Sequence, residues 1–182
     1  MALSTFVYSG IQLFQEGSQD VAVSLICSAL DATAKKRYPK KNNNERNKQF
    51  MRDSMHIITY FGMPGIFATG IRIKCVDVPG IKTDKDGYVG IEDIIYHVIR
   101  CALVHECDVA ELIVFTEHVR IGDFNQRFEI PKSVFVGLAM STILAPENAD
   151  ERCAKSIVIN TASGSYEVND IWGAESSIFN RN

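Results

Sequence analysis

The sequence predicts an α+β fold, in which a helical bundle is followed by a small antiparallel β-hairpin and then by a helix towards the C-terminus. Residues 20–37 predict the bundle, because their apolar side chains recur at the period of an α-helix over a wide arc. Residues 111–121 and 126–130 predict the hairpin, because both are rich in β-branched and aromatic side chains and flank a turn at 122–125. The length of 182 residues and the apolar content of 46% are sufficient for one domain with a buried core.

Three further helices are predicted before the hairpin. They cover residues 4–15, 45–60 and 91–106. Asn44 is expected to cap the second of these. The third is apolar on nearly every side, which is typical of a helix enclosed by others or lying in a subunit interface. Residues 62–90 hold six of the twelve glycines, and we expect an irregular loop there with one short strand at 71–78.

The last part of the chain is predicted to pack on the bundle. Its elements are a helix over 131–144 and a second, weaker hairpin formed by 156–160 and 165–169. Pro131 suits the first turn of that helix, and Pro146 ends it. We therefore divide the chain into a helical bundle at 1–110, which includes the irregular loop 62–90, and a second part at 111–182. The second part contains the β-hairpin, the helix and the short strands, and the two parts together form one structural domain.

The composition favours a cytoplasmic protein. The five cysteines stand at scattered positions and form no CxxC pair, so reduced thiols in a reducing compartment are the simplest interpretation. The N-terminus has no basic region ahead of a hydrophobic stretch, which argues against a secretory signal. No apolar run approaches the ~20 residues needed to span a bilayer, so no membrane partner is expected.

A strongly basic segment interrupts an acidic chain. Residues 35–52 carry eight Lys or Arg and one Glu, a net charge of +7, which leaves −10 for the remainder of a chain whose total is −3. Such a block can attract the phosphates of a polyanion, so RNA is an expected partner. The candidate RNA-binding residues are Lys36, Arg37, Lys40, Lys41, Arg46 and Lys48. A solvated helix end and loop is the alternative interpretation of the same charges.

The helix predicted at 91–106 holds the residue types best suited to chemistry. RNA cleavage without a metal ion needs a group that moves protons near neutral pH, as His105 can, and a fixed cation that holds the phosphate, as Arg100 can. Five residues turn a helix by about 500°, so these two side chains would point about 140° apart on a regular helix. Convergence on one phosphate therefore requires that the helix ends or distorts near His105, or that two copies of the helix build the site together.

The stretch from Arg100 to His105 (RCALVH) matches the Arg-x(4–6)-His motif of the HEPN superfamily, helical-bundle proteins found in prokaryotic toxins, phage-defence systems and larger RNA-cleaving proteins. The surroundings are similar too. Residues 22–38 resemble an early bundle helix of small prokaryotic HEPN-like proteins, and 96–106 resemble their motif helix. The hairpin that follows resembles their β extension, so that the resemblance covers roughly residues 20–145.

The resemblance implies a homodimer in which the paired motif helices form a cleft and act as a metal-independent endoribonuclease. In that role Arg100 would bind the scissile phosphate and His105 would serve as acid or base, with no cofactor. A toxin or phage-defence role implies a cognate antitoxin or another protein as a further partner. Cys101 departs from the family pattern, since many active members carry a polar residue there, often Asn, and a thiol is a poor substitute for an amide in hydrogen bonding.

Three other interpretations of this helix remain open. A non-catalytic HEPN module would use it to dimerise or to bind a partner protein. A zinc site would use His97, Cys101 and His105, whose spacing of four residues places them on one stripe of the helix. A purely structural arrangement would bury His105 on the core face and leave Arg100 beside Tyr96 on the surface.

Overall fold

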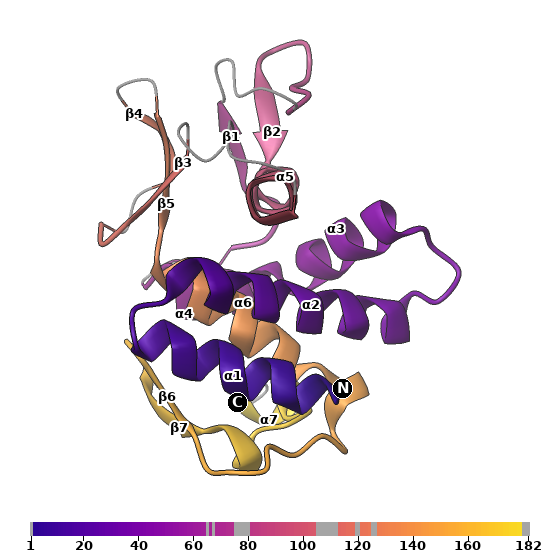
Figure 1. The fold of residues 1–182 in the computed structure, drawn as a ribbon. Coiled ribbons are helices and arrows are strands. Elements are labelled where there is room, and N and C mark those ends of the chain that lie inside the picture. The colour runs from indigo at the N-terminus through magenta and orange to yellow at the C-terminus, as the bar shows by residue number, and fades with distance from the viewer. Residues whose placement is uncertain are drawn as a thin grey trace.

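The computed structural model describes residues 2–64, 66, 68–74, 81–104, 113–118, 121–124 and 127–179. The fold is α+β, as predicted: a helical bundle forms the body of the molecule, and small sheets lie around it (Figure 1). No helix within these ranges is both long and apolar enough to cross a membrane.

Four helices form the body of the bundle. They are α1 (Leu3–Gln15), α2 (Gln19–Arg37), α4 (Met55–Gly62) and α6 (Ser133–Leu144). A tight turn joins α1 to α2, and in it Gly17 has a φ of +88°, a left-handed conformation that glycine adopts readily. The predicted helix at 131–144 is α6, which is the central helix of the bundle because ten of its twelve residues are buried.

α4 and α6 cross at close range through two glycines. A Cβ atom at Gly137 would collide with the carbonyl oxygen of Ile58, and one at Gly62 would lie 3.0 Å from the Cα of Val134. The hydroxyl of Ser133 also donates to the carbonyl oxygen of Gly62. Because a side chain at either glycine would push the helices apart, these two positions set how closely the bundle packs.

Two more helices lie above this body in Figure 1. α3 (Asn43–Asp53) follows the end of α2 and packs beside it. α5 (Ile91–Val104) crosses over α2 and α3, and the figure shows it almost end-on. The predicted helix at 91–106 is therefore present over its described residues.

The single helix predicted at 45–60 is instead two helices. α3 and α4 are separated at Ser54, a buried residue whose backbone (φ −97°, ψ 10°) leaves the helical conformation. The break redirects the chain so that apolar side chains on both sides of it reach the core. The cap also lies two residues earlier than predicted, because the side chain of Asn42 rather than Asn44 accepts the backbone N–H of Glu45 (3.0 Å).

The strands form three small sheets. These are β1 (Arg72–Lys74) with β2 (Tyr88–Gly90), β6 (Val158–Thr161) with β7 (Gly164–Glu167), and a three-stranded sheet in the order β3 (Ile113–Thr116), β5 (Arg127–Pro131), β4 (Gly122–Phe124). The strand predicted at 71–78 is described at its start as β1, and the remainder of that range lies outside the described residues. β2, its antiparallel partner, is a strand that the sequence did not indicate.

A β-hairpin is present, but the predicted pairing of 111–121 with 126–130 is wrong. The antiparallel partner of β5 is β4, with Gly122 opposite Glu129. β4 occupies part of the stretch 122–125 that was predicted as the turn. Two residues separate it from β5, and so short a connection favours a tight hairpin. β3, from the predicted strand 111–121, lies on the other side of β5 and runs parallel to it. The extension is therefore a hairpin with a third, parallel strand.

The C-terminal part closes against the bundle. The hairpin predicted at 156–160 and 165–169 is the β6–β7 pair. Beyond it the sequence indicated no element, yet a short helix, α7 (Glu175–Phe179), is present. The side chain of Glu175 lies 3.2 Å from Nε2 of His56 on α4, so an ion pair contributes to the docking of this helix when the imidazole is protonated.

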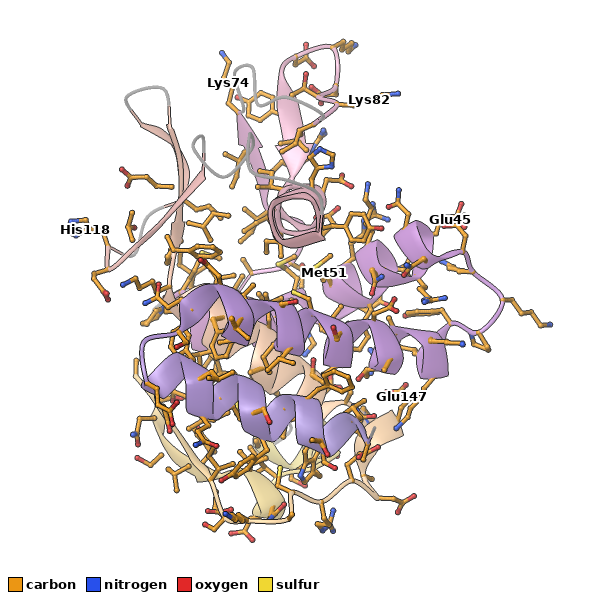
Figure 2. The ribbon with its side chains drawn as sticks, viewed as in Figure 1. Glu45, Met51, Lys74, Lys82, His118 and Glu147 are labelled. Carbon is orange, nitrogen blue, oxygen red and sulfur yellow. The ribbon has the colours of Figure 1, made fainter. Side chains whose placement is uncertain are left out.

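Ion pairs and hydrogen bonds join Lys36 and Arg37, at the end of α2, to the segment that follows α6, and we call these contacts the polar clamp. Glu147, one of its residues, is labelled in Figure 2. Arg37 donates to both carboxylate oxygens of Glu147, at 2.7 and 2.9 Å. Lys36 donates to Glu151 at 3.2 Å and to the side-chain oxygen of Asn148 at 2.9 Å. The clamp therefore holds two segments together that lie more than a hundred residues apart in the sequence.

Asn148 is the buried centre of this clamp. Its amide nitrogen donates to Oγ1 of Thr33 on α2 (2.9 Å) and to the carbonyl oxygen of Thr142 on α6 (2.8 Å). Glu151 also accepts the backbone N–H of Ser4 at the start of α1 (3.1 Å). Because buried polar groups are costly to leave unpaired, this network fixes α1, α2 and α6 relative to one another.

The clamp keeps both of its carboxylates ionised. Burial alone would raise the pKa of Glu147, but the hydrogen bonds and charge of Arg37 outweigh burial and hold that pKa below its ordinary value. Burial would also raise the pKa of Glu151. The hydrogen bonds from Lys36 and from the backbone N–H of Ser4 outweigh burial, so that the pKa of Glu151 is lowered as well. A lowered pKa stabilises the folded state above the ordinary pKa, and this stabilisation is lost as the pH falls through the folded pKa.

We expect the free energy of unfolding to decrease as the pH falls below about 4.5, the ordinary value for these glutamates, because both must then take up protons. Arg37→Met should lower that free energy by about 1–2 kcal/mol at neutral pH and weaken its acid dependence, because Glu147 then loses its cation. Urea unfolding at a series of pH values measures both effects. Lys155→Met, at an exposed lysine, is the control, and an unchanged acid dependence in Arg37→Met would contradict the clamp.

Candidate functional site

The basic segment 35–52 does not form an open field of positive charge. Five of its eight cations are paired with carboxylates of other elements. The pairs are Lys36–Glu151 (3.2 Å), Arg37–Glu147 (2.7 Å), Arg46–Asp31 (2.9 Å), Lys48–Asp93 (2.7 Å) and Arg52–Glu92 (2.7 Å). Each carboxylate offsets a charge that would otherwise attract phosphate, so much of the local charge is compensated within the protein.

The other cations of the segment are lysines at or near the connection between α2 and α3. Lys35 and Lys40 are exposed. Lys41 donates to Oε1 of Gln49 (3.2 Å) and lies 5.2 Å from the centre of the Tyr38 ring. Of the six predicted RNA-binding residues, Lys40 and Lys41 are the two without a carboxylate partner in the part of the chain that the structure describes.

Asp31 on α2 anchors α3. Its carboxylate accepts hydrogen bonds from Nε and Nη2 of Arg46 at 2.9–3.2 Å. It also accepts the side-chain amide of Asn47, which is buried, at 2.8 Å. Arg46 is therefore part of the contact between two helices, and an RNA strand could bind it only in competition with this carboxylate.

α5 has a buried apolar face and a half-buried polar face. The buried face consists of Ile91, Ile94 and Ile95, each at most 1% exposed. The second face consists of Asp93, Tyr96 and His97, which are half-buried. Because a helix repeats every 3.6 residues, position 100 falls on the second face, nearly in line with position 93.

Two of the ion pairs bind the first turn of α5 to α3. Nζ of Lys48 lies 2.7 Å from Asp93, and Nε of Arg52 donates to Glu92 at 2.7 Å. Glu92 is buried, at 8% exposed, and acidic residues in the first turn are also favoured by the helix dipole. Lys48 lies 5.5 Å from the centre of the Tyr96 ring, a cation–π distance. α3 therefore fixes where the polar face of α5 begins.

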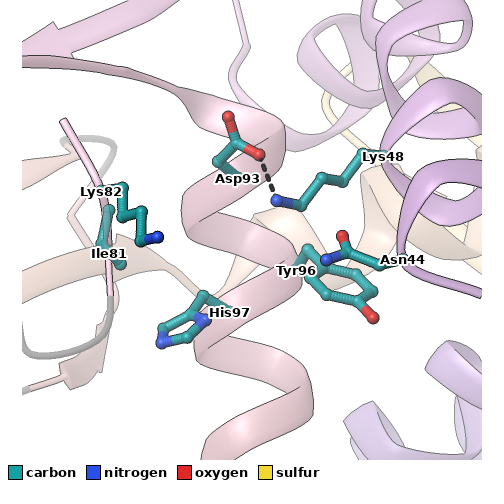
Figure 3. A pocket seen from close by; sticks show the side chains of 7 residues that line it. All are labelled: Asn44, Lys48, Ile81, Lys82, Asp93, Tyr96 and His97. Carbon is teal, nitrogen blue, oxygen red and sulfur yellow. Dashed lines mark ion pairs between the residues drawn. The ribbon is translucent and has the colours of Figure 1, made fainter. Parts of the chain in front are cut away.

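A pocket of about 440 Å³ opens on the polar face of α5, between α3 and residues 81–82 (Figure 3). The described residues that line it are Asn44, Lys48, Ile81, Lys82, Asp93, Tyr96 and His97. Figure 3 shows Lys48 and Lys82 extending towards this face of α5 from opposite sides. Two ammonium groups, an amide, a phenol and an imidazole together can bind a phosphate through charge-assisted hydrogen bonds.

The predicted catalytic residues belong to the end of α5 and to the residues after it. Arg100 and Cys101 are within the described helix, but their side chains lie outside the described part of the structure, as does the whole of His105. The pair of Arg100 and His105 therefore stays a prediction. So does the zinc alternative, of which His97 is the described member; the described residues contain no group of three metal-binding side chains.

Sequence reasoning selected Lys48 and His97 but not the pocket that brings them together. The polar residues Asp93, Tyr96 and His97 stand at i, i+3 and i+4 in an otherwise apolar helix, and this stripe was the signal that could have indicated a functional face. Lys82 lies in the irregular stretch before β2. No periodicity in the sequence connects it to α5, so its place in the pocket was not predictable.

Comparison with known proteins assigns the chain to a family. Residues 3–180 match the family Rv1289, and the chain belongs to it. Similar proteins are the Uncharacterized protein Rv1289 of Mycobacterium tuberculosis and the Uncharacterized protein Mb1320 of Mycobacterium bovis, each 28% identical over 153 residues, which cover 80% of this chain and 70% of the relative. No solved structure matches the chain. These findings do not test the resemblance to the HEPN superfamily, which stays a prediction.

If the basic segment binds single-stranded RNA, we expect Lys40 and Lys41 to account for most of the salt dependence that the segment contributes. Each phosphate contact by a lysine without a carboxylate partner changes the slope of log affinity against log salt by about 0.7. Lys40→Gln and Lys41→Gln should each flatten that slope, as measured by fluorescence anisotropy between low and physiological salt. Lys155→Gln is the control, and equal slopes for all three variants and the wild type would show that the segment is only a solvated surface.

Proposed function

We propose that the protein binds RNA and cleaves it without a metal ion, as an HEPN-type endoribonuclease of a prokaryotic toxin or phage-defence system. The observation that carries this proposal is the pocket on the polar face of α5, because it gathers Lys48, Lys82 and His97 on the face that continues to Arg100. Position 100 follows position 97 by less than one helical turn, about 4.5 Å along the axis. A strand held in the pocket would therefore pass directly over the motif.

The proposed reaction is an internal transfer within the RNA. The 2′-hydroxyl gives its proton to a base and attacks the phosphorus, and the bond to the 5′-oxygen of the next nucleotide breaks as that oxygen takes up a proton. The products are a 2′,3′-cyclic phosphate and a free 5′-hydroxyl. His105 would move the protons, and Arg100 would bind the non-bridging oxygens and stabilise the charge that develops on them. The reaction needs no cofactor.

A homodimer is part of this proposal. A regular helix points positions 100 and 105 about 140° apart, so two copies of α5 would supply the two groups to one phosphate. Helical spacing also places position 103, a leucine, on the outward face beside position 100. An apolar residue on an otherwise polar outward face is typical of an interface. A cognate antitoxin or another protein would be a further partner.

A cytoplasmic location is the compartment that we propose. In the part of the chain that the structure describes, Cys27 and Cys153 are both free thiols. Burial raises the pKa of Cys27 to about 12 and that of Cys153 to about 11, so both remain protonated near neutral pH. Thiols that stay unpaired are typical of proteins that fold in a reducing compartment.

A second candidate function, a non-catalytic HEPN module that dimerises or binds a partner protein, is favoured by the ion pairs. Arg37, Arg46 and Arg52 are all bound to carboxylates, an arrangement that holds helices together rather than offering charge to RNA. Cys101 favours the same candidate, because a thiol bonds weakly to phosphate or water. The two candidates share the dimer and differ in whether RNA is bound and cut.

The purified protein should cut single-stranded RNA in the presence of EDTA and leave 2′,3′-cyclic phosphate ends, while DNA of the same sequence should survive because it lacks the 2′-hydroxyl. His105→Ala should lower the rate by about 10²–10⁴, because it removes the proton-transfer group. Arg100→Ala should lower the rate by a similar factor, because this substitution removes the phosphate-binding cation. Gel electrophoresis of labelled RNA measures the rates, with Lys155→Ala as the control.

Two outcomes would contradict this assignment. RNA left intact by a folded dimer near neutral pH would favour the non-catalytic module. Activity that disappears with EDTA and returns with zinc would favour the site of His97, Cys101 and His105.

The protein should sediment as a homodimer at micromolar concentration. The contact should lie in the C-terminal half of α5, because the isoleucines of its first half are already buried within the protomer. Leu103→Asp should dissociate the dimer by placing a charge in the contact. Val21→Asp is the matched control, because Val21 is an exposed apolar residue of another helix, α2, at 55% exposed. A monomeric wild-type protein would refute the dimer.

A further inference from the structure

The pocket on α5 contains two lysines, Lys48 and Lys82, that have no role in the proposed cleavage step. Lys48 comes from α3 and Lys82 from the stretch before β2, and the two extend towards the same space from opposite sides (Figure 3). One carboxylate, that of Asp93, stands between them on α5. Among the described lining residues, two ammonium groups and one carboxylate leave a positive surplus in a concave site, which is the charge that an anion requires.

The two lysines differ in how they are held. Lys48 is 27% exposed and is oriented by Asp93 at 2.7 Å and by the ring of Tyr96 at 5.5 Å. Lys82 is exposed and lines the opposite wall of the pocket. Because Lys48 is already held in place, binding a phosphate between it and the exposed Lys82 costs little conformational entropy on the Lys48 side.

We propose that the pocket is a phosphate subsite, in which Lys48 and Lys82 bind the phosphodiester next to the one that is cut. This inference rests on the proposed function for the identity of the strand as RNA. The pocket extends along α5 from Asp93 to His97, which lies less than one helical turn before position 100, so a strand bound by both lysines continues towards the motif. The ring of Tyr96 offers the neighbouring nucleotide a surface on which a base can stack.

Asp93 acts in this subsite as an internal competitor. It binds Lys48 in the free protein, and a phosphate must share that ammonium group with it or displace it. Removing the charge of Asp93 therefore leaves Lys48 available and lowers the repulsion of the incoming phosphate. If the pocket is a phosphate subsite, Asp93 weakens the binding of nucleic acid, although its ion pair with Lys48 helps to anchor α5.

Binding of short single-stranded DNA tests the subsite apart from cleavage, because DNA has the same phosphates and lacks the 2′-hydroxyl. Lys82→Gln should weaken binding about threefold at moderate salt, as expected for an exposed charge pair. It should also lower the slope of log affinity against log salt by about 0.7. Lys85→Gln is the matched control, because Lys85 is an exposed lysine three residues further on that does not line the pocket.

The pair of Asp93→Asn and Lys48→Gln gives the sharper comparison. Both variants break the same ion pair, so a purely structural role predicts that they change DNA binding in the same direction or not at all. The subsite predicts opposite directions: tighter binding by about threefold for Asp93→Asn and weaker binding for Lys48→Gln. Thermal melting of both variants establishes that each is folded.

The outcomes separate the subsite from the proposed function. Wild-type affinity in Lys82→Gln, or weaker binding in a folded Asp93→Asn protein, would overturn the subsite even if RNA is cut. Opposite shifts in the two variants would support it. If those shifts occur while RNA is left intact, the phosphate subsite stands and the endoribonuclease assignment fails.

Discussion

The two ion pairs between α3 and the first turn of α5 are the contacts on which the rest of the candidate site depends. Arg52 binds Glu92, which is buried, and Lys48 binds Asp93 at the edge of the pocket. A buried carboxylate that loses its cation is strongly destabilising, so the start of α5 cannot turn or slide away from α3. The buried isoleucines behind these pairs set the rotation of α5. Its polar face is thereby presented to the pocket.

These contacts also show why positive charge in this chain is not equivalent to affinity for RNA. All three arginines of the basic segment are bound to carboxylates, whereas Lys35, Lys40 and Lys41 have no such partner among the described residues. The planar guanidinium forms two parallel hydrogen bonds to a carboxylate, and a strongly hydrated ammonium group gains less from burial. The arginines therefore hold helices together, and the lysines are the cations left to bind a polyanion. Lys48 lies between the two roles, because its carboxylate partner lines the pocket.

The sequence predicted those elements whose local pattern and burial agree. The helix expected at 20–37 is observed as Gln19–Arg37, because a strong apolar period coincides with its buried face. The break at Ser54 was not predictable, since apolar side chains continue on both sides and the change of direction is imposed by the close crossing of α4 and α6. The parallel pairing of β3 and the arrival of Lys82 at α5 depend on tertiary contacts in the same way. Local patterns contain no information about such contacts.

The rotation of α5 limits how Arg100 and His105 can act together. Position 100 lies nearly opposite the buried isoleucines, and a regular helix continued to position 105 would return to the core side, about 140° away. An imidazole there would point away from any phosphate that Arg100 of the same protomer contacts. The pair can act on one phosphate only if His105 leaves the helical path or belongs to a second copy of the chain. In the second case Lys48 and Lys82 of one protomer would hold the strand while the two protomers together cut it. Binding would then be a property of the monomer, and cleavage a property of the dimer.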